Sequence, residues 1–233
     1  MWLPEVECGG RNSTCGGAPI SITVRPADMD PKQHWERVYA NKSTDRLGWY
    51  EPHLQTTLNW IRELGLGKDA SIIDVGGGAS TLVDDLLDGE FQHLTILDLS
   101  KHALATVKTR LGAAADKVTW REGDITSVQL PPAHYDLWHD RAVFHFLTNP
   151  EDRKKYAVTL DRALKSGGHV IIGTFAPEAP PRCSGLEVER YSPERLHQEL
   201  GERLVLQTHR QELHVTPGGV KQMYLYCRFR KPA

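Results

Sequence analysis

The chain has 233 residues, a formal net charge of −2 and a hydrophobic share of 39%. This length predicts one full-size domain, and the near-neutral charge argues against a nucleic-acid-binding or membrane-surface protein. No apolar run approaches the roughly 20 residues of a membrane span. Residues 1–10 contain two acids and lack the apolar core of a secretory signal, so we expect a cytoplasmic protein.

The four cysteines stand at positions 8, 15, 183 and 227. This spacing fits neither paired metal-ligand motifs nor a dense disulfide framework, so reduced thiols and no bound metal are expected. The first two cysteines lie in a stretch that also contains glycine, serine and proline. We predict that residues 1–28 form a flexible tail and residues 29–233 one domain.

Two helices are predicted before the first strand. Asp30-Pro31 has the residue types of a helix N-cap and first helical position. A second helix is expected over 53–64, because apolar residues recur there at helical spacing and Gly65 follows as a terminator.

A glycine-rich turn follows the first predicted strand. The run 71–75 is apolar and β-branched, and it stops at Gly76-Gly77-Gly78, as a buried parallel strand does. A helix is expected over 79–88. The next strand, 93–97, is followed by Asp98, whose carboxylate can accept two hydrogen bonds from a ribose diol. These features predict a nucleoside site at the carboxyl ends of the first two strands.

Strands and helices alternate through the rest of the chain, which favours a mainly parallel sheet. The expected elements are a helix over 100–111, strands over 118–122 and 135–140, a helix over 151–165 ended by Gly167-Gly168, a strand over 169–174, a helix over 192–200, and a hairpin of strands 204–215 and 221–230. The hairpin adds an antiparallel strand.

The nucleoside is not predicted to be a dinucleotide, because Thr81 stands where G-x-G-x-x-G requires its third glycine. The pattern Asp74-x-Gly76-x-Gly78-x-Ser80 resembles motif I of the class I S-adenosylmethionine (SAM) methyltransferases, which usually have glycine in place of Ser80. A carboxylate beside the turn suits a cationic ligand. The resemblance implies an α/β, Rossmann-like, seven-stranded and mainly parallel sheet with helices on both faces and the last strand antiparallel.

The resemblance also implies which residues bind SAM. Asp98 would hold the ribose hydroxyls, Asp124 the adenine amino group, and Ile125 would pack on the adenine ring. The full predicted cofactor set is Asp74, Gly76, Gly77, Gly78, Ser80, Asp98, Leu99, Asp124, Ile125 and His139. For Asp124 an ordinary turn acid is the alternative.

The candidate catalytic residues lie at and just after the end of the fourth core strand. His139, Asp140 and His145 are the candidates for a general base, should the acceptor arrive protonated. The run Asp140-Arg141-Ala142 resembles thiopurine-type thiol methyltransferases and a branch of protein lysine methyltransferases, with Ala142 in place of the family's glycine. Ordinary packing is the alternative for both histidines.

Residues 29–66 are expected to form a helical lid, because aromatic residues before the core often close over cofactor and acceptor in this superfamily. Trp49 and Tyr50 are the predicted acceptor contacts there, with plain packing as the alternative. The loop 176–191 is long and proline-rich. It supplies Arg182, Cys183 and Arg190 as further acceptor contacts.

We therefore predict a SAM-dependent methyltransferase that acts on a small molecule. A protein lysine methyltransferase, a SAM- or nucleoside-binding module without catalysis, and an NAD-dependent reductase are the alternatives. Thr81 disfavours the last of these. Neither the attacking atom nor the oligomeric state follows from the sequence.

Overall fold

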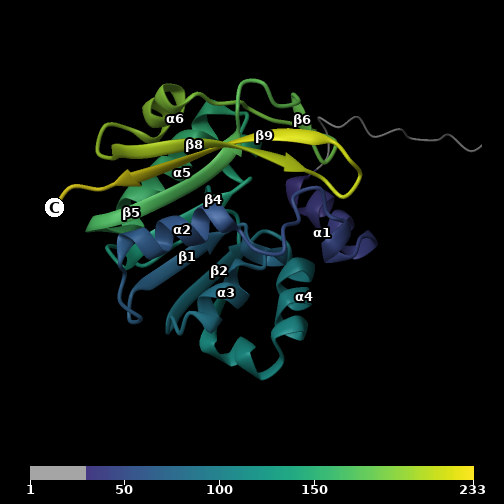
Figure 1. The fold of residues 1–233 in the computed structure, drawn as a ribbon, viewed down its shortest axis with the longest axis horizontal. Coiled ribbons are helices and arrows are strands. Elements are labelled where there is room, and N and C mark those ends of the chain that lie inside the picture. Colours follow the sequence, from purple (N-terminus) through teal and green to yellow (C-terminus); the bar gives the residue numbers. More distant parts are fainter. Residues whose placement is uncertain (1–29) are drawn as a thin grey trace, which may run out of the picture.

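A computed structural model describes residues 30–233, so the predicted tail of residues 1–28 lies outside the described part. Two helices precede the sheet, α1 (Pro31–Asn41) and α2 (Gln55–Leu64). Asp30 caps α1, because its side chain accepts a hydrogen bond from the Lys32 amide. Figure 1 shows α1 at one end of the molecule, beside α4.

A seven-stranded sheet in the order β3-β2-β1-β4-β5-β9-β8 forms the centre of the molecule. Its strands are β1 (Ser71–Val75), β2 (His93–Asp98), β3 (Val118–Glu122), β4 (Tyr135–Arg141), β5 (Leu164–Phe175), β8 (Val205–Val215) and β9 (Lys221–Arg230). Only β9 runs against the others, since it pairs antiparallel with both β5 and β8. The predicted Rossmann-like sheet with a reversed last strand is confirmed.

Helices cover both faces of the sheet, and β1 shows why. Ile72 packs in a cluster with residues of α2, α3 (Leu82–Asp88) and α4 (Lys101–Leu111). Ile73 points to the opposite face, where α5 (Pro150–Ala163) and α6 (Pro193–Leu200) pack. Successive side chains of a strand alternate between faces, so a strand buried on both sides reads as a continuous apolar run.

Two predicted element starts differ from the structure by three residues or more. The helix after β1, α3, begins at Leu82 and not at Ala79, because Gly77–Ala79 forms a separate 3₁₀ turn, η3. Strand β5 begins at Leu164, within the range predicted as helix. Leu164 is fully buried opposite Tyr135, and Gly167 has φ 78 inside the strand, so the glycine pair bends a strand and does not end a helix.

The predicted 176–191 loop contains a small hairpin, formed by β6 (Arg182–Cys183) and β7 (Leu186–Glu187). Within residues 30–233, every helix is too short or too polar to span a lipid bilayer. β2 and β3 lie on one side of β1 in the sheet, and β4 lies on its other side, so the strand order reverses direction at β1. In α/β sheets this switch point is where a ligand crevice opens beyond the strand ends.

Candidate functional site

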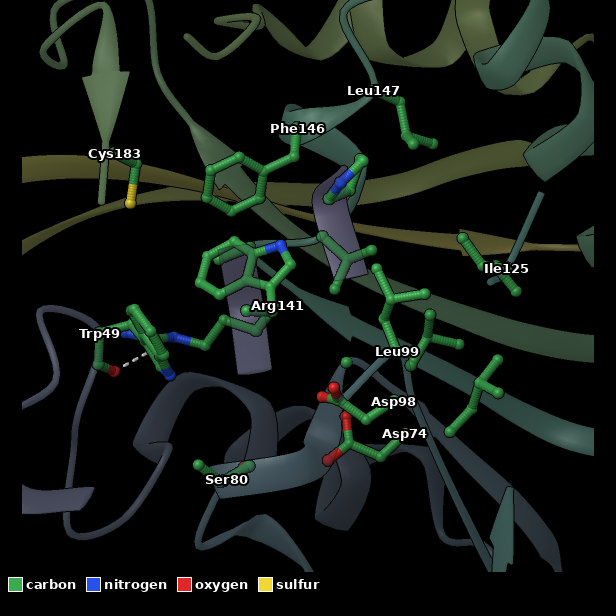
Figure 2. Close-up of a pocket in the computed structure, with 18 of the residues that line it drawn as sticks. Trp49, Asp74, Ser80, Asp98, Leu99, Ile125, Arg141, Phe146, Leu147 and Cys183 are labelled. Carbon is green, nitrogen blue, oxygen red and sulfur yellow. Dashed lines mark hydrogen bonds between the residues drawn. The ribbon is translucent and has the colours of Figure 1, made fainter. Parts of the chain in front are cut away.

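A cavity of about 330 Å³ opens at this switch point, beyond the carboxyl ends of β1, β2 and β4. That volume lies in the range of small-molecule sites, roughly 300–1,000 Å³. One end is lined by acids and small residues from the strand ends, and the other by aromatic residues. Figure 2 shows Asp74 and Asp98 together at the first end, with Phe146 and Cys183 at the other.

The glycine turn is closely packed at all three positions. A Cβ atom on Gly76 would collide with the Val143 side chain, and Gly76 has φ 72. A Cβ on Gly77 would strike the Asp74 carboxylate, and one on Gly78 would meet the Asp98 carboxylate. Gly76 itself lines the cavity, whereas Gly77 and Gly78 form the layer behind it.

Asp98 ends β2 with its carboxylate held by two backbone amides. Oδ2 accepts from the Gly78 amide at 3.0 Å, and Oδ1 accepts from the Ser100 amide at 2.7 Å. Burial raises the pKa of Asp98 to about 6, and the two amide bonds oppose that rise. The turn and the acid that the sequence separates by twenty positions are therefore in direct contact.

Asp74 and His139 form a buried pair on neighbouring strands β1 and β4. The His139 Nδ1–H donates to Asp74 Oδ1 at 2.6 Å, and Nε2 accepts from the Thr57 hydroxyl at 3.1 Å. Asp74 Oδ2 is buried and has no partner in the described chain. An orphaned carboxylate oxygen beside a ligand cavity fits a cationic group such as the α-ammonium of SAM.

The remaining residues predicted for the cofactor also border the cavity. Leu99, Asp124 and Ile125 lie at the ends of β2 and β3, and Ser80 lies at the end of η3. Asp124 Oδ1 already accepts from the backbone amide and the hydroxyl of Thr126, at 2.8 Å each. The Ser80 hydroxyl accepts from the Leu82 amide and begins α3.

The structure does not bring Asp140 and His145 to the cavity with His139. Asp140 is fully buried behind the wall, where it accepts from the Tyr156 hydroxyl at 2.7 Å and from the Val143 amide at 2.9 Å. Burial raises its pKa to about 6. In this arrangement Asp140 does not face the cavity, so it does not reach a molecule bound there.

His145 lies in the 3₁₀ turn η5 (Phe144–Phe146), and its ring packs between those of Phe146 and Phe175, 4.5 and 4.6 Å away. Burial lowers its pKa to about 3, with a further contribution from Arg141, so the ring is neutral. It does not line the cavity. The His145 ring is packed among aromatic side chains, but both of its nitrogens are buried without a hydrogen-bond partner in the described chain.

Aromatic side chains surround the far end of the cavity. Trp35 of α1 lies 5.5 Å from Trp49 and 5.0 Å from Phe146 between ring centroids, and Tyr39 lies 5.8 Å from Trp49. Trp49 and Tyr50, the predicted acceptor contacts of the N-terminal segment, both line the cavity. Trp35 and Tyr39 place α1 in the wall of the cavity.

Of the three predicted acceptor contacts in the 176–191 segment, only Cys183 lines the cavity. Burial raises the pKa of its thiol to about 11, so it is protonated at neutral pH. Arg182 points away and pairs with Glu187 at 3.3 Å. Arg190 donates to the carbonyl groups of Pro177 and Ala179 outside the cavity, so neither arginine is placed to hold an acceptor.

Arg141 lines the cavity, although sequence reasoning did not select it. Its guanidinium donates to Glu51 at 2.6 Å and to the Trp49 carbonyl at 2.6 Å. Burial alone would raise the pKa of Glu51, but His214 and Arg141 hold it below its ordinary value. The position of Arg141 at the end of β4 was the available signal, while its partner lies ninety residues earlier in the chain.

Comparison with known proteins agrees with this geometry. Residues 73–172 match the methyltransferase domain family. The chain is 24% identical over 175 residues to EEF1A lysine methyltransferase 2 of Danio rerio. The aligned region covers 67% of this chain and 75% of that protein.

Solved structures share the fold. The N-methyltransferase NodS from Bradyrhizobium japonicum, solved with S-adenosylhomocysteine (SAH), superposes with a TM-score of 0.67 at 20% identity, covering 88% of this chain and 100% of NodS. A chain from a study of disulfide-to-thioacetal conversion in echinomycin biosynthesis gives a TM-score of 0.70 at 17% identity, covering 86% and 91%.

The domain match and these relatives support a class I SAM-dependent methyltransferase, and the solved structures show the same fold. It is a methyl-transferring enzyme, and SAM is its cofactor.

Proposed function

We propose that SAM lies along the cavity with its ribose at Asp98 and its amino-acid part at the Gly76 turn. The two amides that fix the Asp98 carboxylate support the first contact. The orphaned Oδ2 of Asp74 supports the second, because a cationic ammonium group would complete its hydrogen bonding. Leu99 and Ile125 would enclose the adenine, with Asp124 at its edge.

His139 is proposed to orient Asp74, because both of its ring nitrogens are engaged within the protein. Asp140 is proposed to stabilise the turn after β4 through the amides of Val143 and Phe144. Bound SAM supplies an activated methyl group on a sulfonium. The protein then contributes alignment and exclusion of water, since transfer is an in-line displacement.

The acceptor is proposed to be a small molecule. The observation that carries this proposal is the aromatic enclosure at the far end of the cavity, where Trp35 of α1 meets Trp49 and Phe146. Such an enclosure buries a small acceptor on several sides, and it suits a flat or cationic group. Trp49, Tyr50 and Cys183 are the proposed acceptor contacts.

A lysine side chain of a protein is the second candidate. It is favoured by the relatives named EEF1A lysine methyltransferase 2 in Danio rerio and Homo sapiens, each 24% identical to this chain. A single lysine side chain is narrow enough for an aromatic enclosure, and the ammonium form would interact with the ring faces.

A methyl-transfer assay with labelled SAM decides between the two candidates. Three acceptor probes are offered separately: thiophenol, a heteroaromatic amine and a lysine-containing peptide. Methylation of a small probe and not of the peptide is the expected result. Label transfer to the peptide alone would replace the small-molecule proposal by the lysine one. Calorimetry with SAH and NAD on the same preparation shows whether the cofactor site is intact.

We also propose a cytoplasmic location. Cys183 and Cys227 are buried and form no disulfide with each other within residues 30–233, as expected in a reducing compartment. Fractionation of source cells with an antibody against the protein tests this proposal, and recovery outside the cytosol would contradict it.

A further inference from the structure

An arginine, a glutamate and a histidine from distant parts of the chain meet beside the aromatic end of the cavity. Arg141 closes β4, Glu51 lies in the segment before α2, and His214 lies near the end of β8. The Arg141 Nη2 lies 2.6 Å from Glu51 Oε1, and His214 Nδ1 lies 2.9 Å from the same oxygen. Their side chains are 6%, 17% and 5% exposed, so the cluster is shielded from solvent.

The same side chains also bind the backbone of residues 48–51. The Arg141 Nη1 donates to the Trp49 carbonyl at 2.6 Å, a bond that Figure 2 marks with a dashed line. His214 Nε2 lies 2.8 Å from the Gly48 carbonyl and donates to it when protonated at that nitrogen. The Thr81 hydroxyl donates to the Glu51 carbonyl at 2.9 Å. Contacts to the carbonyl groups of residues 48, 49 and 51 therefore hold this short segment in one position.

Arg141 is itself fixed from behind by β9. Its Nε donates to the Tyr226 hydroxyl at 2.8 Å, and its guanidinium lies 4.6 Å from the centre of the Tyr224 ring. A planar guanidinium uses separate N–H groups for Glu51, Trp49 and Tyr226, which a lysine ammonium on a flexible stem does not reproduce. Removing one partner of such a buried pair leaves the other charge uncompensated.

The segment that this cluster holds is the wall of the aromatic end. Trp49, Tyr50 and Glu51 line the cavity, and Trp49 contacts the rings of Trp35 and Tyr39. We propose that Arg141, Glu51 and His214 are positioning residues that fix residues 48–51 as the acceptor-side wall of the cavity. The acceptor assignment in this inference rests on the proposed function.

Hydrogen–deuterium exchange of residues 48–52 tests the proposal in the full chain. Arg141→Gln should speed exchange there about tenfold, the scale of losing one hydrogen bond to a charged group. His214→Gln should speed exchange in the same segment. It serves as the second variant, because it leaves the Arg141–Glu51 pair in place if Arg141→Gln folds poorly.

Arg228→Gln is the matched control. Like Arg141, Arg228 pairs with a glutamate and lies beside an aromatic ring: it is 2.8 Å from Glu63 and 5.7 Å from the centre of the Trp60 ring. Arg228, Glu63 and Trp60 do not line the cavity. A general loss of stability would act through both arginines. Faster exchange at residues 48–52 in the Arg141 and His214 variants, and not in Arg228→Gln, supports the proposal.

SAH calorimetry separates the two ends of the cavity. The Arg141 and His214 variants should keep SAH affinity within about twofold, because neither side chain bonds to Asp74 or Asp98, the two proposed cofactor acids. With thiophenol as acceptor, KM should rise more than kcat falls. Unchanged exchange at residues 48–52, or exchange equal to that of Arg228→Gln, would overturn the proposal that Arg141, Glu51 and His214 position this segment. The exchange result decides the proposal even if none of the three acceptor probes is methylated.

Discussion

At the scale of single residues, the proposed cofactor end contains two buried acids, Asp98 and Asp74. Asp98 receives two amide hydrogen bonds, and one oxygen of Asp74 is left without a partner in the described chain. Both carboxylates are less than a tenth exposed. A buried acid that still needs a cationic or hydroxyl partner favours ligand binding over packing alone.

Replacing Asp98 by asparagine should weaken SAH binding by about 1.5–3 kcal/mol, the value of hydrogen bonds to a charged group. The wild-type protein should also bind SAH about tenfold more weakly near pH 5 than near pH 7.5. The pKa of Asp98 is raised to about 6, so one unit below it only about a tenth of the carboxyl is ionised. Calorimetry across this pH range measures both effects. A pH dependence that persists unchanged in Asp98→Asn would assign the titration to another group.

Replacing Gly78 by alanine should destabilise the fold by about 1–3 kcal/mol, the usual cost of overpacking. The added methyl group would press on the Asp98 carboxylate and on Ala103. Gly48→Ala is the control, because a Cβ there meets only the Thr216 methyl group, at 4.0 Å. Urea denaturation compares the two variants, and equal stability would mean that the turn relaxes around the methyl group.

At the scale of elements, α1 is attached to the core by polar and aromatic contacts. The Glu36 carboxylate accepts from the Lys101 and His102 amides and so caps the N-terminus of α4. Trp35 lies on the rings of Trp49 and Phe146. No α1 residue is fully buried, which distinguishes this helix from α2 and α3. An element held this way can open at lower cost than the core.

Trp35→Ala should speed SAH dissociation about tenfold, because each lost aromatic pair contributes about 0.5–1.5 kcal/mol to the closed position. The melting temperature should change little. Trp120→Ala is the control, since Trp120 lies on β3 and does not line the cavity. Stopped-flow displacement of SAH gives the rate, and equal rates in wild type and Trp35→Ala would show that α1 does not limit release.

At the scale of the whole molecule, the strand order assembles the site. β1 and β4 are neighbours although β2 and β3 come between them in the chain, so Asp74 meets His139. The same fold buries two acids, Asp98 and Asp140, at the strand ends. Burial raises the pKa of each to about 6.

This burial gives a pH dependence of stability with a defined sign. A pKa raised in the folded state means that the native protein holds the proton more tightly than the unfolded chain. The contribution of Asp140 is therefore complete below about pH 4 and is lost as the pH rises through 6. Relative to Asp140→Asn, the wild type should gain up to about 3 kcal/mol between pH 7 and pH 4. Chemical denaturation at both pH values measures this difference, and a difference that shrinks at pH 4 would contradict the assignment.

The sequence by itself determined the sheet and the cofactor end. Apolar runs mark the strands, and Gly76–Gly78 and Asp98 follow directly from the requirements of a tight turn and a diol acceptor. These signals are local, because each motif is a few consecutive residues whose backbone role is the same in any α/β sheet. The start of β5 escaped prediction because pairing with β4 overrides the helical pattern before Gly167.

Only the tertiary structure decided the aromatic end of the cavity, where we propose that the acceptor binds. Asp140, His145, Arg182 and Arg190 have the residue types that chemistry uses, but their direction depends on packing with β9, α5 and the β6–β7 hairpin. The reverse holds for Arg141, whose role depends on Glu51 and His214, ninety residues before it and seventy-three after it. Side chains so far apart in sequence meet only once the sheet has formed, so no local pattern could pair them.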